Sequence, residues 1–213
     1  MWTTVETPNL LNQILDSLFA LSGWEAIATL LGIAYVILAI KQSLWAWPSA
    51  FVSTLIYTLL FWQAQLPFQS LLNAYYLVMA VYGFWLWHQP PQTTKHIQVH
   101  TQSAGFHLGF LAFGSLLTVA IGLYLATNDY SAHPYLDAGV MIFSVLNTYL
   151  MARKLLENWL YWLVINSAAI YLYWLSGFYL TIVMFMIYFI LAIIGYRTWR
   201  KEMTSPTQPQ SQE

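Results

Sequence analysis

The chain has 213 residues and a formal net charge of −1; 59% of its residues are hydrophobic and only 7% are charged. Soluble domains carry about 25% charged residues, so this composition excludes an ordinary soluble protein, and without a basic excess no nucleic-acid partner is expected. The chain has no cysteine, which excludes disulfides, thiol catalysis and thiolate metal sites. Apolar runs of roughly 20 residues instead predict a polytopic protein of the lipid bilayer.

The amino-terminal segment, residues 1–23, is predicted to lie outside the bilayer core. It lacks the basic region that opens a cleavable signal peptide. Residues 10–21, which include Asp16, have the pattern of a short amphipathic helix at the membrane surface.

Seven apolar stretches follow this segment, each long enough to cross a bilayer. Pro48 suits the first turn of the second stretch, where its missing N–H costs nothing. The tail, residues 202–213, is polar and is expected to be disordered. The expected spans are 24–40, 47–63, 70–87, 106–126, 134–152, 159–175 and 179–196.

The positions of the cations predict how the chain is oriented. With seven spans, all seven Lys and Arg residues fall on one side, and the loops on the other side hold none. The positive-inside rule then places the amino terminus in the periplasm and the carboxyl terminus in the cytoplasm. The seven cations are Lys41, Lys95, Arg153, Lys154, Arg197, Arg200 and Lys201.

An internal repeat appears when the chain is shifted against itself by 112 residues. The first three spans then align with the last three without a gap. This predicts an all-α membrane protein with seven transmembrane helices in a 3+1+3 arrangement. Two parallel three-helix repeats, 24–88 and 127–201, would be joined by a loop and a connector helix, 89–126, in which Gly105 and Gly109 could serve close helix packing. The aligned pairs include Trp47 with Trp159, Trp62 with Trp174, Tyr76 with Tyr188, Gly83 with Gly195, Trp87 with Trp199, Lys41 with Arg153, and Glu25 with Asp137.

The sixth span carries the clearest candidate binding surface. Trp159, Trp162 and Asn166 are spaced i, i+3 and i+7, which places them on one helical face. Two indoles could stack on a flat ring while the amide orients it. Two alternatives stay open: tryptophans also form interfacial belts, and asparagines also bridge membrane helices.

Other polar or aromatic residues inside the spans extend this candidate site, because polar groups in a bilayer are costly and are often functional. Ala50 and Thr54 share the stripe of Trp47 on the second span. Glu25 and Asp137 would lie near the outer face, either as an anionic vestibule or as partners of positive helix amino termini. Asn73 and Asn147 could instead bridge helices. The further candidates for substrate binding are Trp47, Tyr35, Tyr57, Asn73, Tyr76, Ser144 and Asn147.

No Lys or Arg lies inside any predicted span. A phosphate at mid-membrane would need such a partner, so we expect a flat, aromatic, neutral or cationic small molecule held by stacking and cation–π contact. The histidines lack metal-ligand spacing, and neither a metal nor another cofactor is expected. No nucleophile–base pair stands at a plausible spacing, so no enzyme is predicted. The seventh span has no lysine for retinal.

Four segments resemble the Pnu family of bacterial vitamin transporters: LENWLYWLVIN, LDAGVMIFSVLNTYLMARK, GFYLT and WPSA with YGFWLW. The resemblance covers about Trp24 to Lys201. It implies a 3+1+3 fold like that of the SWEET sugar transporters, an inner-membrane location, and facilitated diffusion of a vitamin without phosphate. It also implies homotrimers and trapping of the substrate by a cytoplasmic kinase. Trp159, Trp162 and Asn166 match the family's tryptophan–tryptophan–asparagine motif.

The resemblance implies nicotinamide riboside in one branch of the family and thiamine in another. This chain has Ser53 and Asn73 where enterobacterial riboside members have longer amides, and an apolar stretch, 181–189, where they have a glutamate. Fewer polar partners and more aromatic surface favour thiamine, with nicotinamide riboside as the alternative. Proton-coupled transport is a third possibility, because Glu25 and Asp137 could titrate.

Overall fold

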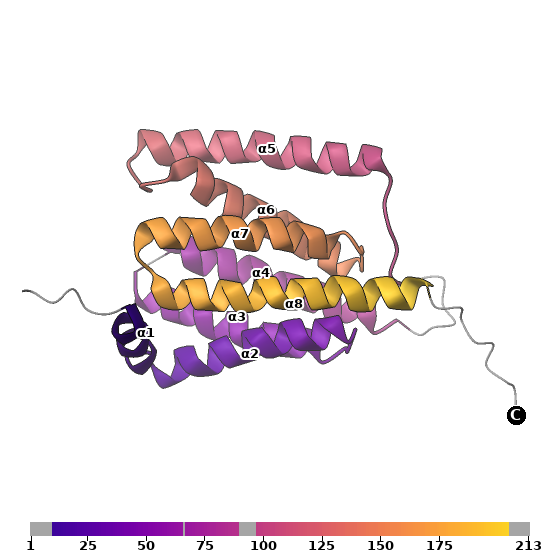
Figure 1. Cartoon of the computed structure of the whole chain (residues 1–213), viewed down its shortest axis with the longest axis horizontal. Coiled ribbons are helices and arrows are strands. Elements are labelled where there is room, and N and C mark those ends of the chain that lie inside the picture. Colours follow the sequence, from indigo (N-terminus) through magenta and orange to yellow (C-terminus); the bar gives the residue numbers. More distant parts are fainter. Residues whose placement is uncertain (1–9, 66, 90–96, 205–213) are drawn as a thin grey trace, which may run out of the picture.

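The computed structural model describes residues 10–65, 67–89 and 97–204 (Figure 1). In these residues it contains eight α-helices and no strand longer than an isolated bridge. The helices are α1 (Leu10–Phe19), α2 (Gly23–Ile40), α3 (Ala46–Gln63), α4 (Pro67–Trp87), α5 (Ala104–Thr127), α6 (Pro134–Ala152), α7 (Asn158–Ser176) and α8 (Tyr179–Thr204).

Local sequence signals explain several helix ends. The Ser22 side chain accepts from the Glu25 amide and the Glu25 carboxylate accepts from the Ser22 amide, which forms a capping box at the start of α2. Pro134 occupies the first position of α6. Gly177 ends α7 with a left-handed φ of 75°, a conformation that glycine adopts without strain.

The chain is an all-α membrane protein. Helices α2, α5, α6 and α8 are long and apolar enough to cross a bilayer. Helices α3, α4 and α7 have 18, 21 and 19 residues, which is also close to the length a bilayer requires. Their tryptophans, tyrosines and hydroxyl residues lower their mean hydropathy.

The predicted repeat is visible in the helix boundaries. The ends of α2 and α6, at Ile40 and Ala152, differ by 112 positions, and so do the starts of α3 and α7 and of α4 and α8. The turn after each first helix also matches: Gln42 and Lys154 are both left-handed, with φ of 51° and 55°. The packing repeats as well, because α2 contacts α3 and α8 just as α6 contacts α7 and α4.

Four tryptophans form the core at one end of the bundle. Trp47 and Trp87 meet edge to face at 5.2 Å, and Trp159 and Trp199 do so at 5.3 Å. The Trp47 ring lies against Gly83 of α4, and the Trp159 ring lies against Gly195 of α8. A Cβ on Gly83 would come within 2.4 Å of the Trp47 ring.

Helix α5 packs against α6 at the edge of the bundle (Figure 1). The predicted packing through Gly105 and Gly109 is wrong. A Cβ on Gly109 would meet nothing within 4 Å, whereas one on Gly114 would come within 2.6 Å of Phe143 and one on Gly122 within 2.5 Å of Tyr135. Close packing does use glycines of this helix, but about one and a half and three and a half turns beyond Gly109.

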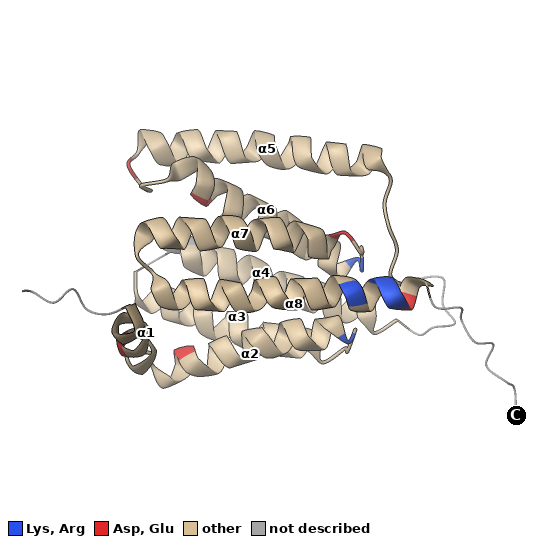
Figure 2. Ribbon diagram, viewed as in Figure 1, with Lys and Arg blue, Asp and Glu red and all other residues tan. Residues whose placement is uncertain are grey.

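The basic residues of the described chain gather at one end of the bundle (Figure 2). They belong to the carboxyl ends of α2 and α8 and to the α6–α7 loop. Helix α8 continues to Thr204, so residues 202–204, predicted to belong to the tail, are helical. Lys95 and the tail beyond residue 204 lie outside the described residues.

Candidate binding site

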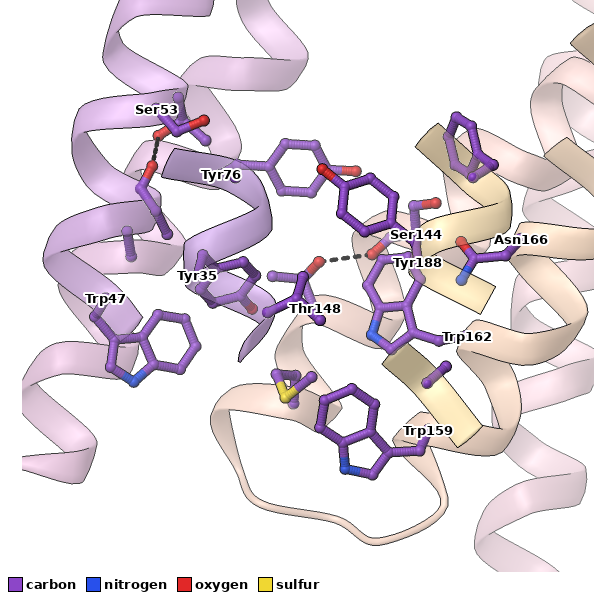
Figure 3. A pocket seen from close by; sticks show the side chains of 18 residues that line it. Tyr35, Trp47, Ser53, Tyr76, Ser144, Thr148, Trp159, Trp162, Asn166 and Tyr188 are labelled. Carbon is purple, nitrogen blue, oxygen red and sulfur yellow. Dashed lines mark hydrogen bonds between the residues drawn. The ribbon is translucent and has the colours of Figure 1, made fainter. Parts of the chain in front are cut away.

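A cavity of about 280 Å³ lies between the two groups of helices, with walls from α2, α3, α4, α6, α7 and α8 (Figure 3). It has the size of a small-ligand site and is lined mainly by apolar and aromatic side chains. The lining residues are Gly32, Tyr35, Val36, Trp47, Ala50, Ser53, Thr54, Tyr76, Ala80, Ser144, Thr148, Met151, Trp159, Trp162, Asn166, Phe185, Tyr188 and Ala192.

Seven of the ten predicted binding residues line this cavity. Trp47 and Trp159 are each 1% exposed and belong to the tryptophan core at one end of it. Trp162 and Asn166 lie on the α7 wall, above Trp159 (Figure 3). The other three are Tyr35, Tyr76 and Ser144.

The structure places the remaining three outside the lining. Asn73 donates to the carbonyl of Gln69 on its own helix at 2.9 Å. Tyr57 shares a 2.7 Å hydrogen bond with Thr29.

Asn147, the third of these residues, is fully buried and donates to the carbonyl of Asn158 at 2.9 Å. This bond ties α6 to the start of α7, which is the bridging role given above as the alternative.

The two predicted vestibule acids also lie outside the lining. The Glu25 carboxylate accepts from the Ser22 amide at 2.7 Å. Asp137 lies in the first turn of α6. Both acids therefore occupy helix amino termini, where a negative charge complements the helix dipole.

Sequence reasoning missed Tyr188, Thr148, Phe185 and Ser53 as cavity residues. Tyr188 could have been found, because the 112-residue shift pairs it with Tyr76. The same shift pairs Phe185 with the candidate Asn73, although Asn73 itself lies outside the cavity.

Asn166 is the lining residue whose polar group is best placed to orient a ligand. Its side chain is 3% exposed and has no hydrogen bond to any other described residue. Figure 3 shows its amide pointing into the cavity, on the same wall as the Trp162 ring. An amide buried in an apolar wall gains free energy when a ligand supplies its hydrogen-bond partner.

The sequence profile of the nicotinamide mononucleotide transporter family matches residues 22–201. This match covers all the helices that line the cavity. The chain belongs to this family. It is accordingly a multi-pass membrane transporter and not an enzyme.

Two curated members of the nicotinamide mononucleotide transporter family are similar along most of the chain. The nicotinamide riboside transporter PnuC of Escherichia coli is 25% identical over 206 residues, which cover 85% of this chain and 86% of that protein. The riboflavin/roseoflavin transporter RibM of Streptomyces davaonensis is 25% identical over 178 residues, covering 82% and 83%.

A crystal structure of the vitamin B3 transporter PnuC has the same fold. It superposes with a TM-score of 0.68 at 22% identity, covering 96% of this chain and 95% of that one. Together with the family match, this confirms the resemblance to the Pnu transporters noted from the sequence.

The charge of the cavity bears on what a member of this family could hold here. Among the described residues that line the cavity, none is Lys, Arg, His, Asp or Glu. The polar groups are hydroxyls, indole N–H groups and one amide, which suit hydroxyl, amide and ring-nitrogen groups of a ligand.

Proposed function

We propose that this protein takes up an unphosphorylated, aromatic B vitamin by facilitated diffusion, with nicotinamide riboside as the first candidate. The observation that carries the proposal is the uncharged cavity in which the Trp162 ring and the unpaired Asn166 amide share one wall. The indole suits stacking on a flat ring, and its electron-rich face attracts a cationic one.

The transporter would have seven spans in a 3+1+3 arrangement. The lengths of α2 to α8 and the 112-residue recurrence of helix boundaries support this count. The single end at which the described basic residues gather (Figure 2) supports a periplasmic amino terminus and a cytoplasmic carboxyl terminus. The cavity would then lie between two repeats, as transporter sites commonly do.

The absence of cations from the described lining supports a substrate without phosphate. A buried phosphate would require Arg, Lys or an exposed helix amino terminus as a partner. Net uptake of a neutral or cationic vitamin by diffusion would then depend on a cytoplasmic kinase that traps it.

The cavity supports nicotinamide riboside over thiamine, the vitamin that the sequence alone favours. The sequence argument for thiamine depends partly on Asn73, which lies outside the cavity. Ser144, Thr148 and Tyr188 add hydroxyls to the lining, and these suit a ribose. Two relatives are named for nicotinamide riboside and riboflavin. Riboflavin has three fused rings and would need more room than a single pyridine ring.

Isothermal calorimetry of the detergent-purified protein tests the proposal. Nicotinamide riboside, thiamine and riboflavin would be titrated separately, with nicotinamide mononucleotide as the phosphorylated control. We expect binding of the riboside and silence for the mononucleotide. Tight binding of the mononucleotide would refute the argument from charge.

Flux into vesicles tests the mechanism separately. Facilitated diffusion predicts that collapsing the proton gradient leaves the initial uptake rate unchanged. A large loss of uptake would favour proton coupling instead. Light scattering of the same preparation would show whether the protein is the homotrimer that the family resemblance implies.

A further inference from the structure

Two tyrosines, Tyr76 of α4 and Tyr188 of α8, occupy equivalent positions in the cavity wall, 112 residues apart. Figure 3 shows both rings extending into the cavity from opposite walls. Their surroundings differ at one place. The Ser144 side chain lies near the Tyr76 hydroxyl, whereas the counterpart of Ser144 at the same shift is Gly32.

Gly32 gives the Tyr188 hydroxyl no neighbouring hydroxyl like that of Ser144 near Tyr76. A Cβ placed on Gly32 would lie 3.3 Å from the Tyr188 hydroxyl oxygen, so the two residues face each other closely. A serine here could reach the phenol. Glycine offers no side-chain group to bond.

The other hydroxyls on this side of the cavity donate their protons to backbone carbonyls. Ser53, whose hydroxyl would lie 3.5 Å from the same Cβ, donates to the carbonyl of Ala28 at 2.7 Å. Thr54 donates to the carbonyl of Ala50 at 2.8 Å. Within the described residues, Tyr188 has no hydrogen bond to another side chain.

The paired lining positions also show a consistent asymmetry. Where two paired lining residues differ, the second repeat carries the more polar group or the larger ring: Ser144 for Gly32, Thr148 for Val36, Trp162 for Ala50 and Asn166 for Thr54. A ligand would therefore be stacked and oriented from the α6–α7 side. The first-repeat side offers space, and the free hydroxyl that reaches this space comes from Tyr188.

We propose that Tyr188 is a specificity-determining residue whose hydroxyl bonds a hydroxyl or amide group of the substrate, and that Gly32 keeps this hydroxyl free. The inference rests on the proposed function and names a second point of polar recognition, opposite Asn166. A ligand without the matching group leaves the phenol unpaired in an apolar wall. Such a ligand therefore binds more weakly than one that supplies the hydrogen bond.

Calorimetry with nicotinamide riboside tests the role of the hydroxyl. Tyr188→Phe keeps the ring and removes one oxygen, and we expect about three- to tenfold weaker binding, the cost of one hydrogen bond between neutral groups. Tyr76→Phe removes a hydroxyl that has the Ser144 side chain nearby, and we expect a smaller loss. Tyr149→Phe, at a residue outside the cavity, controls for expression and folding.

A second pair of variants tests Gly32 without touching Tyr188. Gly32→Ala and Gly32→Ser add the same Cβ, but only the serine adds a partner for the phenol. We expect Gly32→Ser to bind the riboside about three- to tenfold more weakly than Gly32→Ala. Equal affinities for this pair would overturn the proposed role of Gly32.

Ligand variation separates this inference from the proposed function. The N-methylnicotinamide cation keeps the pyridinium ring and its amide but lacks the ribose hydroxyls, so a contact to ribose predicts equal affinities for wild type and Tyr188→Phe. An equal loss for both ligands would move the contact to the ring amide, which the inference also allows. If the wild type binds the riboside and Tyr188→Phe binds it with the same affinity, this inference is refuted while the proposed function stands. Wild-type silence toward the riboside, thiamine and riboflavin would refute the proposed function and, with it, this inference.

Discussion

The indole nitrogen of Trp87 donates to the carbonyl oxygen of Ala152 at 2.9 Å. Its counterpart 112 residues later, Trp199, donates to the carbonyl of Ile40 at 3.1 Å. Each bond joins the last helix of one repeat to the end of the first helix of the other. Together they tie the two halves at the end of the bundle where the described cations gather (Figure 2).

Further contacts strengthen the same end. The Lys154 ammonium lies 4.7 Å from the centre of the Trp87 ring, and the Gln42 amide donates to the Glu202 carboxylate. Burial lowers the pKa of Lys154, while the charge of Glu202 acts to raise it. These contacts would have to open for a substrate to leave on this side, so we interpret the structure as closed at this end, which is the cytoplasmic end in the proposed orientation.

Removing one indole donor should therefore loosen this end. Trp199→Phe keeps an aromatic ring but loses the bond to Ile40. The native chain has no cysteine, so Ala80→Cys in the cavity wall gives a single site for an impermeant thiol reagent. We expect Trp199→Phe to raise labelling of this cysteine from this end of the bundle by about three- to tenfold, the effect of one lost hydrogen bond.

The control for this labelling experiment is Trp85→Phe, at a tryptophan that is 53% exposed. It should leave labelling unchanged. If Trp199→Phe also leaves labelling unchanged, the indole–carbonyl bond is a packing contact and not part of a gate.

The glycines beneath the core tryptophans predict a stability effect. A Cβ on Gly195 would come within 2.6 Å of the Trp159 ring, so Gly195→Ala must displace the indole. We expect a loss of about 1–3 kcal/mol, seen as a lower melting temperature in detergent. Gly109→Ala is the matched control, because its Cβ would meet nothing within 4 Å and it should preserve or raise stability. Equal melting temperatures for the two variants would contradict the packing argument.

Much of the fold follows from the sequence because its signals are local or repeated. Apolar runs and helix-end residues such as Pro134 and Gly177 locate the helices. The 112-residue shift pairs Trp47 with Trp159 and Trp87 with Trp199, which occupy matching places in the structure. The packing of α5 was misplaced because a small-residue spacing does not show which turn of a helix meets its neighbour.

Only part of the cavity lining was predicted from the sequence, and the reason is related. Periodicity shows which residues share a face but not how far along that face a cavity extends. Asn73 and Tyr57 lie about one turn beyond Tyr76 and Thr54, the last lining residues of their helices. Asn147 is about 60° around α6 from Ser144, given 100° per residue, and this rotation turns it toward α7.

Substitution of Trp162 measures how much ring stacking contributes to substrate binding. Trp162→Ala should weaken binding of the riboside by about 1–3 kcal/mol, because it removes the ring face that the cavity presents. Trp174→Ala is the control on the same helix, since Trp174 is 58% exposed and does not line the cavity. Unchanged affinity of purified Trp162→Ala in calorimetry would remove the indole from the binding site.

Substitution by leucine should affect binding at Asn166 and stability at Asn147. Asn166→Leu removes an amide that has no partner among the described residues, so it should lower riboside affinity by about 1–3 kcal/mol while the melting temperature stays near that of wild type. Asn147→Leu removes the donor to Asn158 in a fully buried position, so it should lower the melting temperature. Measuring both affinity and melting for both variants separates recognition from helix bridging. If Asn166→Leu binds normally but melts early, Asn166 bridges helices and the orienting role falls to another group of the cavity.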